Sequence, residues 1–193
     1  MIMDTILYGF DARTSLSGTD PNWSDLRRAR YLLRPEISRP LSVDPQVWPK
    51  AFSVEFNEGF ARDYWTDLAE LRRISRKQDV DKDDFALVAL AVRGDKDQVY
   101  TLFMPPTPSE LDANWQTLGW DVADSGLISA LSNCGYRSEE VDTLRQIFAP
   151  KLNDHGLFDD VEAAETFCVR SEARVPEHPP FFVHQLFCLA SAD

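Results

Sequence analysis

An unbroken apolar run from Phe85 to Val92 is the strongest constraint on how this chain folds. The run has eight residues, whereas a helix that crosses a bilayer needs about 20. A strand with one wet face alternates apolar and polar residues, so a continuous run suits a strand that is buried on both faces. We therefore expect this segment to be a central strand of a sheet.

Four other segments are rich in the branched and aromatic residues typical of strands. They are Thr5–Phe10, Ser53–Asn57, Val99–Met104 and Phe181–Leu189. The connector between Val92 and Val99 contains Gly-Asp-Lys-Asp and is short. It predicts an antiparallel hairpin between the central strand and Val99–Met104.

Apolar residues spaced by three or four predict helices between the strands. One apolar stripe runs from Tyr64 to Ile74. A second helix is expected to have Ser138 as its N-cap and to end near Pro150. A third is expected to begin at a capping box formed by Asp159 and Glu162.

These elements do not alternate regularly as strand and helix along the chain. That order favours an α+β fold with a largely antiparallel sheet of about five strands, and with helices concentrated in the C-terminal half. No Ser-rich or Gly-rich linker and no internal repeat divides the sequence. We expect residues 1–193 to form a single globular domain.

The charge is unevenly distributed along the chain. Of 32 acidic and 20 basic residues, residues 1–77 hold 11 acidic and 12 basic (+1), so residues 78–193 hold 21 acidic and 8 basic (−13) and account for the whole negative net charge of −12. Phosphate contacts need clustered Lys and Arg, which argues against direct, non-specific binding of nucleic acid. A basic protein partner fits this charge better.

The cysteines and the first residues bear on the compartment. Cys134, Cys168 and Cys188 are odd in number and far apart, which suits a reducing compartment better than a disulfide framework. The first residues include no basic leader, and Asp4 interrupts any apolar stretch there. We expect a cytoplasmic protein with no membrane partner.

The usual signatures of catalysis and of cofactor binding are missing from the sequence. His155, His178 and His184 lack the spacing of a zinc site, the glycines are too scattered for a phosphate cradle, and Gly-x-Ser-x-Gly does not occur. We therefore expect no catalytic residue, no cofactor and no metal, and a protein that is not an enzyme.

Two features keep an enzymatic alternative open. Cys134 could be a nucleophile with a His that is near only in space, although Gly135 indicates simply the end of a short helix. Asp121 and Asp124 could form a catalytic or ligand-binding pair. Alternatively, Asp124 is the N-cap of a short helix from Ser125 to Asn133.

Two stretches carry a family resemblance: LGWDVADSGLISALSNCGY at Leu118–Tyr136 and RVPEHPPFFV at Arg174–Val183. They resemble the immunity proteins that bacteria encode beside contact-dependent and other polymorphic toxins. The resemblance covers the C-terminal part of the chain and assigns a role to no individual residue. It implies a protein that binds and neutralises a cognate toxin domain.

A concentrated negative surface agrees with this expectation, because the active site of a nuclease toxin must be positive to hold phosphate. We expect a basic toxin domain as the partner. The candidate partner-binding residues are Asp121, Asp124, Asp159, Asp160, Glu162 and Glu165. The alternatives are a cytosolic module that binds or regulates several basic proteins, and a small enzyme that uses Cys134 or the pair Asp121 and Asp124.

Overall fold

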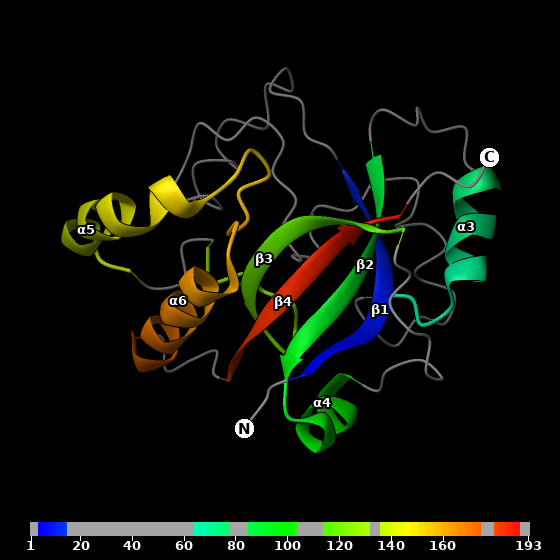
Figure 1. The fold of residues 1–193 in the computed structure, drawn as a ribbon, viewed down its shortest axis with the longest axis horizontal. Coiled ribbons are helices and arrows are strands. Elements are labelled where there is room, and N and C mark those ends of the chain that lie inside the picture. The colour runs from blue at the N-terminus through cyan, green and yellow to red at the C-terminus, as the bar shows by residue number, and fades with distance from the viewer. Residues whose placement is uncertain are drawn as a thin grey trace.

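The computed structural model describes residues 4–14, 64–77, 85–103, 114–131, 136–174 and 180–189. The described residues form one sheet and four α-helices (Figure 1). The strands are β1 (Asp4–Thr14), β2 (Phe85–Gly94), β3 (Gln116–Asp124) and β4 (Phe181–Cys188). The helices are α3 (Leu68–Lys77), α4 (Lys96–Phe103), α5 (Ser138–Phe148) and α6 (Val161–Arg174), with a short 3-10 helix η3 at Ala149–Lys151.

The sheet confirms an α+β fold. Its order is β1-β2-β4-β3, and every neighbouring pair is antiparallel. It has four strands where about five were expected, and α4, α5 and α6 lie from residue 96 onward. The apolar run in β2 lies between β1 and β4, and Val88 to Val92 are fully buried, so its central position is also confirmed.

The side chains of β4 alternate between two faces of the sheet. On one face, Phe181 and Val183 pack with residues of α5 and α6. Further along the same face, Phe187 and Leu189 pack with Leu71 and Ile74 of α3. The opposite side chains of β4 join a cluster that includes Val99 and Phe103 of α4. Helices therefore cover both faces.

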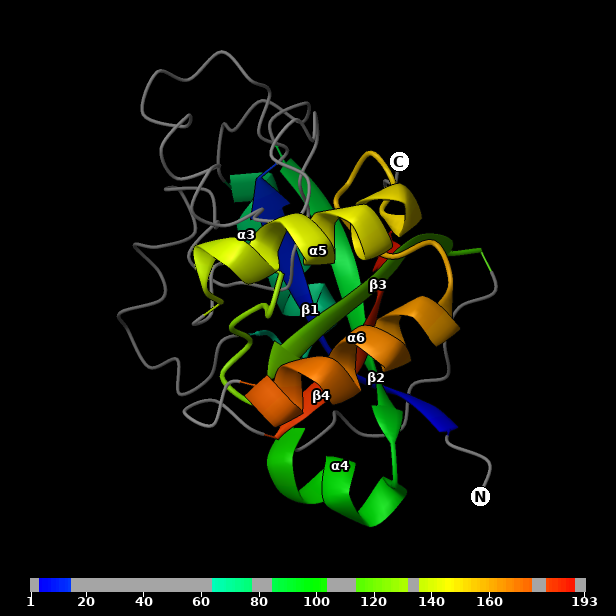
Figure 2. The ribbon, with the colours of Figure 1, turned by 90° about the vertical axis from the view of Figure 1, so that its left-hand side faces the viewer.

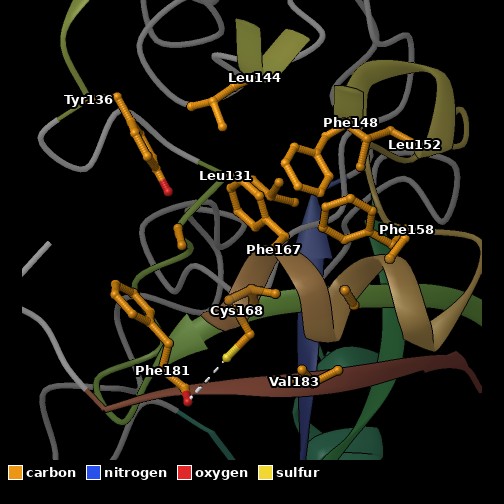
Figure 3. Packing of buried hydrophobic residues seen from close by; sticks show 14 of the residues in the cluster. Leu131, Tyr136, Leu144, Phe148, Leu152, Phe158, Phe167, Cys168, Phe181 and Val183 are labelled. Carbon is orange, nitrogen blue, oxygen red and sulfur yellow. Dashed lines mark hydrogen bonds between the residues drawn. The ribbon is translucent and has the colours of Figure 1, made fainter. Parts of the chain in front are cut away.

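Helices α5 and α6 lie together on one side of β3 and β4 (Figure 2). Between them and the sheet lies an apolar cluster with three aromatic rings at its centre, those of Phe148, Phe158 and Phe167 (Figure 3). Their ring centroids lie 5.0 to 6.1 Å apart. Arg174, the last residue of α6, adds an ion pair to Glu140 of α5 at 2.7 Å.

The expected strand at Val99–Met104 is wrong, and so is the hairpin. Residues Lys96–Phe103 form α4, and β2 pairs with β1 and β4 instead. The Asp95 carboxylate accepts hydrogen bonds from the N–H groups of Asp97 and Gln98, and so caps the helix. Val99 and Phe103 are buried four residues apart, which is the spacing of a helical stripe.

The other local expectations divide into three groups. The strand expected at Thr5–Phe10 is confirmed as part of the longer β1, and the strand expected at Phe181–Leu189 is confirmed as β4, which ends at Cys188. Helices are confirmed as α3, α5 and α6, but two of the expected caps are wrong. Arg137 instead of Ser138 is the N-cap of α5. The expected capping box of Asp159 with Glu162 is replaced by Asp160, whose carboxylate accepts from the N–H of Ala163 just before α6 begins at Val161. The expected strand at Ser53–Asn57 lies outside the described residues.

Strand β3 was not expected, and it forms an edge of the sheet. Trp120 exchanges both of its backbone hydrogen bonds with Phe158, and the side-chain amide of Asn153 donates to the carbonyl of Leu118. These contacts occupy backbone groups that could otherwise pair with another chain.

The segment around Leu157 and Phe158 lies so close to β3 that β3 needs a glycine there. Gly119 has φ +143°, and a Cβ atom there would lie 2.7 Å from Cβ of Leu157 and 2.9 Å from the carbonyl oxygen of Phe158. The register of β3 against β4 shifts at this point, so Gly119 is part of a bulge.

None of the described helices is long and apolar enough to span a membrane.

We predict that Gly119→Ala lowers the free energy of unfolding by about 2–4 kcal/mol, because the new methyl group meets backbone and the residue must keep a positive φ. Urea unfolding followed by tryptophan fluorescence measures the change. Gly126→Ala is the matched control, since its Cβ would meet only a carboxylate oxygen of Asp124, at 3.3 Å. An equal loss in both variants would contradict this account of the bulge.

Candidate functional site: an acidic helix start and a buried polar cluster

The structure separates the six acidic candidates into two groups. Asp121 and Asp124 are buried, with 0% and 7% of their surface exposed. Asp159, Asp160 and Glu162 are exposed, and Glu165 is partly exposed. The six residues therefore do not form one acidic face, and Asp121 and Asp124 do not belong to the exposed set.

Asp121 and Asp124 instead hold the turn that follows β3. The carboxylate of Asp121 accepts a hydrogen bond from the Ser129 hydroxyl at 2.7 Å. The carboxylate of Asp124 accepts from the N–H groups of Gly126 and Ile128, both at 2.9 Å. Residues 125–131 form turns and a bridge rather than the expected helix from Ser125, so Asp124 caps a turn.

The exposed acidic residues gather where α6 begins. We call Asp159, Asp160 and Glu162 the acidic start of α6. None of the three forms an ion pair with a Lys or Arg of the described residues. One turn further along the helix, Glu165 pairs with Arg93 of β2 at 2.6 Å. The negative charges of the acidic start therefore face solvent, at the helix end where carboxylates also favour the helix dipole.

A second concentration of polar groups lies inside the protein, against β1, β3 and β4. His184 of β4 is fully buried, and its Nε2 lies 3.3 Å from the carbonyl oxygen of Ala123. A carbonyl can only accept, so Nε2 carries the proton. The other ring nitrogen, Nδ1, then accepts from the hydroxyl of Tyr8 at 3.0 Å. The ring is therefore a neutral link between β1 and β3.

Charged groups lie close to this link. Arg13 and Asp11 of β1 form an ion pair at 2.5 Å, and both side chains are fully buried. Burial raises the pKa of Tyr8 well above its ordinary value; Arg13 opposes that rise, while Asp11 and Asp121 add to it. We call Tyr8, Asp11, Arg13, Asp121, Ser129 and His184 the buried polar cluster.

The buried polar cluster was missed in the sequence because its members look ordinary locally. Asp11 and Arg13 alternate with Phe10 and Ala12, which is the pattern of a strand with one wet face. The one available signal was His184, which stands in the otherwise largely apolar segment Phe181–Cys188. A polar residue there needs a partner from another strand.

The cluster does bring a His next to a candidate acid, since His184 is the cross-strand neighbour of Asp121. Both nitrogens of that ring are already hydrogen bonded, to Tyr8 and Ala123, and all six cluster residues are at most 2% exposed. This arrangement supports folding better than it supports turnover of a substrate. Cys134 lies outside the described residues.

The segment Leu118–Tyr136, which carries part of the family resemblance, contains several residues that hold the local structure of β3 and of the turn after it. Gly119 allows the bulge, Asp121 binds Ser129, and Asp124 holds the turn. Leu127 in that turn adopts φ +60° with its side chain fully buried. These residues define a fold, and they are not a contact surface.

Comparisons with models of protein families, with curated proteins and with solved structures find no match to this chain. Among the described residues, no three His, Cys, Asp or Glu side chains are placed to hold a metal ion together.

Cys168 offers a test of the packing around α6. Burial, with smaller contributions from Glu172 and Glu165, raises the pKa of its thiol to about 12, and its Sγ lies 3.5 Å from the carbonyl oxygen of Phe181. We predict that in a chain with Cys134→Ser and Cys188→Ser, a disulfide reagent at pH 8 labels the folded protein at least about 100-fold more slowly than the urea-unfolded protein. Equal rates would show that Cys168 is accessible.

The variant with Cys168→Ser and Cys188→Ser keeps only Cys134 and tests the enzymatic alternative by the same labelling assay. An activated nucleophile is labelled rapidly at neutral pH, because it is the thiolate that reacts.

Proposed function

We propose that this chain is an immunity protein that binds and neutralises a cognate bacterial toxin domain. The observation that carries the proposal is the acidic start of α6, where Asp159, Asp160 and Glu162 are exposed without a described cationic partner. The net charge of −12 and the resemblance of Leu118–Tyr136 to immunity proteins support it.

The partner that suits this surface is a basic protein domain. A toxin that cleaves nucleic acid presents Lys and Arg around its active site, and carboxylates can occupy the positions that phosphates would take. Opposite charges also accelerate the encounter of the two proteins, and this acceleration falls as salt screens the charges.

Each acidic candidate has its own place in the proposal. Asp159 and Glu162 contact the toxin directly, while Asp160 both contacts it and caps α6 through Ala163. Glu165 is held by Arg93, so it contributes less charge to the surface. Asp121 and Asp124 act only by holding the turn after β3.

Immunity is tested by growth. Cells are induced to express the C-terminal domain of the large protein encoded immediately upstream, with and without this chain in the same cytoplasm. We expect growth to stop without the chain and to resume with it, and the two purified proteins to form a stable complex. If the domain is toxic and the chain neither binds nor protects, the proposal is wrong.

The binding surface is tested by removing its charge. We predict that Asp159→Asn with Glu162→Gln lowers the association rate with the toxin domain about tenfold at low salt, and less at physiological salt, because exposed charges act mainly on encounter. Stopped-flow fluorescence measures the rate.

The matched control removes the same charge elsewhere. Asp67→Asn with Asp97→Asn changes exposed residues at the start of α3 and in α4, which lie away from α6 in Figure 1, and an Asn at position 67 can still cap α3. Its association rate should stay within about twofold of the unchanged protein, since distant exposed charges are screened. If both double variants slow association equally, the total negative charge of the protein sets the association rate, and the acidic start of α6 is not the contact surface.

A further inference from the structure

His184 is the point at which several separate parts of the chain meet. Its ring centroid lies 5.6 Å from that of Tyr8 in β1 and 5.7 Å from that of Phe103, the last residue of α4. Its cross-strand neighbours are Val92 of β2 and Asp121 of β3. The protonation state of this one ring therefore bears on how Tyr8 of β1 and the end of α4 pack on this face of the sheet.

A second proton on the ring would disturb the hydrogen bonds around it. Nε2–H donates to the Ala123 carbonyl, so a second proton would have to bind Nδ1, which accepts the hydroxyl of Tyr8. The Tyr8 hydroxyl would then have to turn its own proton away and accept from Nδ1–H instead. That proton would lose the one acceptor it has among the described residues, at a site where the rings of Tyr64 and Phe103 lie 5.0 and 4.8 Å from that of Tyr8, and an unpaired buried donor is costly.

Among the described residues, no carboxylate is hydrogen bonded to the ring. From β1 come Tyr8 and the ion pair of Asp11 with Arg13, and Arg13 is itself positive. From β3 comes Asp121, whose carboxylate accepts from Ser129 and makes no hydrogen bond to the ring. The other described titratable group nearby is Tyr64, beside Tyr8, and the described side chains of α4 and β2 that join this cluster are apolar.

We propose that His184 is an acid-sensitive latch, whose neutral ring holds Tyr8 of β1 and Phe103 of α4 on one face of the sheet and whose protonation loosens both elements. This inference does not depend on the proposed function, since it concerns the chain alone. Burial lowers the pKa of His184 to about 3, whereas an unfolded chain takes up the proton near pH 6.5. The contribution of His184 to stability is therefore complete above about pH 6.5 and is lost as the pH falls toward 3.

The test compares the full chain with His184→Gln, and uses His155→Gln as the matched control. Between pH 7.5 and 4.5, the unfolding constant from urea titrations should rise about 100-fold more in the unchanged protein and in His155→Gln than in His184→Gln. An equal rise in all three proteins would overturn the proposal.

The unchanged protein provides a second test that does not require His184→Gln to fold. Nitrogen NMR of the folded chain should show His184 as the Nε2–H tautomer at pH 7 and still neutral at pH 5. When the pH falls from 7 to 5, hydrogen exchange corrected for its intrinsic pH dependence should show a greater loss of protection in β1 and α4 than in α6. A ring that titrates between pH 5 and 7, or an equal loss of protection in all three elements, would overturn the latch.

Discussion

The pairing of β4 between β2 and β3 is the constraint on which the rest of the structure depends. It joins residues that are far apart in sequence, since β2 ends at Gly94 and β4 begins at Phe181. Because β4 is buried on both faces, each helix layer contacts it: α5 and α6 through Phe181 and Val183, α3 through Phe187, and α4 through the opposite face. Without β4, the antiparallel pair of β1 and β2 would be separated from β3.

The fold could be predicted from sequence wherever the pattern of apolar residues within one element was enough to identify it. The apolar run of β2 and the apolar stripes of α3 and α5 were sufficient without knowledge of their partners, and α6 was expected from the polar residues at its start. Val99–Met104 was assigned wrongly because branched and aromatic residues suit a strand, while the cap at Asp95 and the spacing of Val99 from Phe103 indicated a helix. Strand β3 was missed because glycine and aspartate are uncommon in strands.

The candidate site could be predicted only in part, because sequence does not show which carboxylates are buried. Asp121 and Asp159 look alike locally, but Asp121 meets Ser129 across a turn, whereas Asp159 begins a helix at the surface. The link between His184 and Tyr8 joins residues 176 positions apart, and no local pattern indicates it. Some carboxylates of the described residues thus stabilise the fold, whereas others give its surface a negative charge.

The central place of β4 also has a consequence during synthesis. Once Arg93 has been made, 95 more residues must follow before the chain reaches the end of β4 at Cys188. At translation rates of about 5 to 20 residues per second, this takes about 5 to 19 seconds. Throughout that time the apolar segment from Val88 to Val92 has an open edge that can pair with another nascent chain. A molecule of this design therefore benefits from chaperones that shield a single strand until translation reaches its partner.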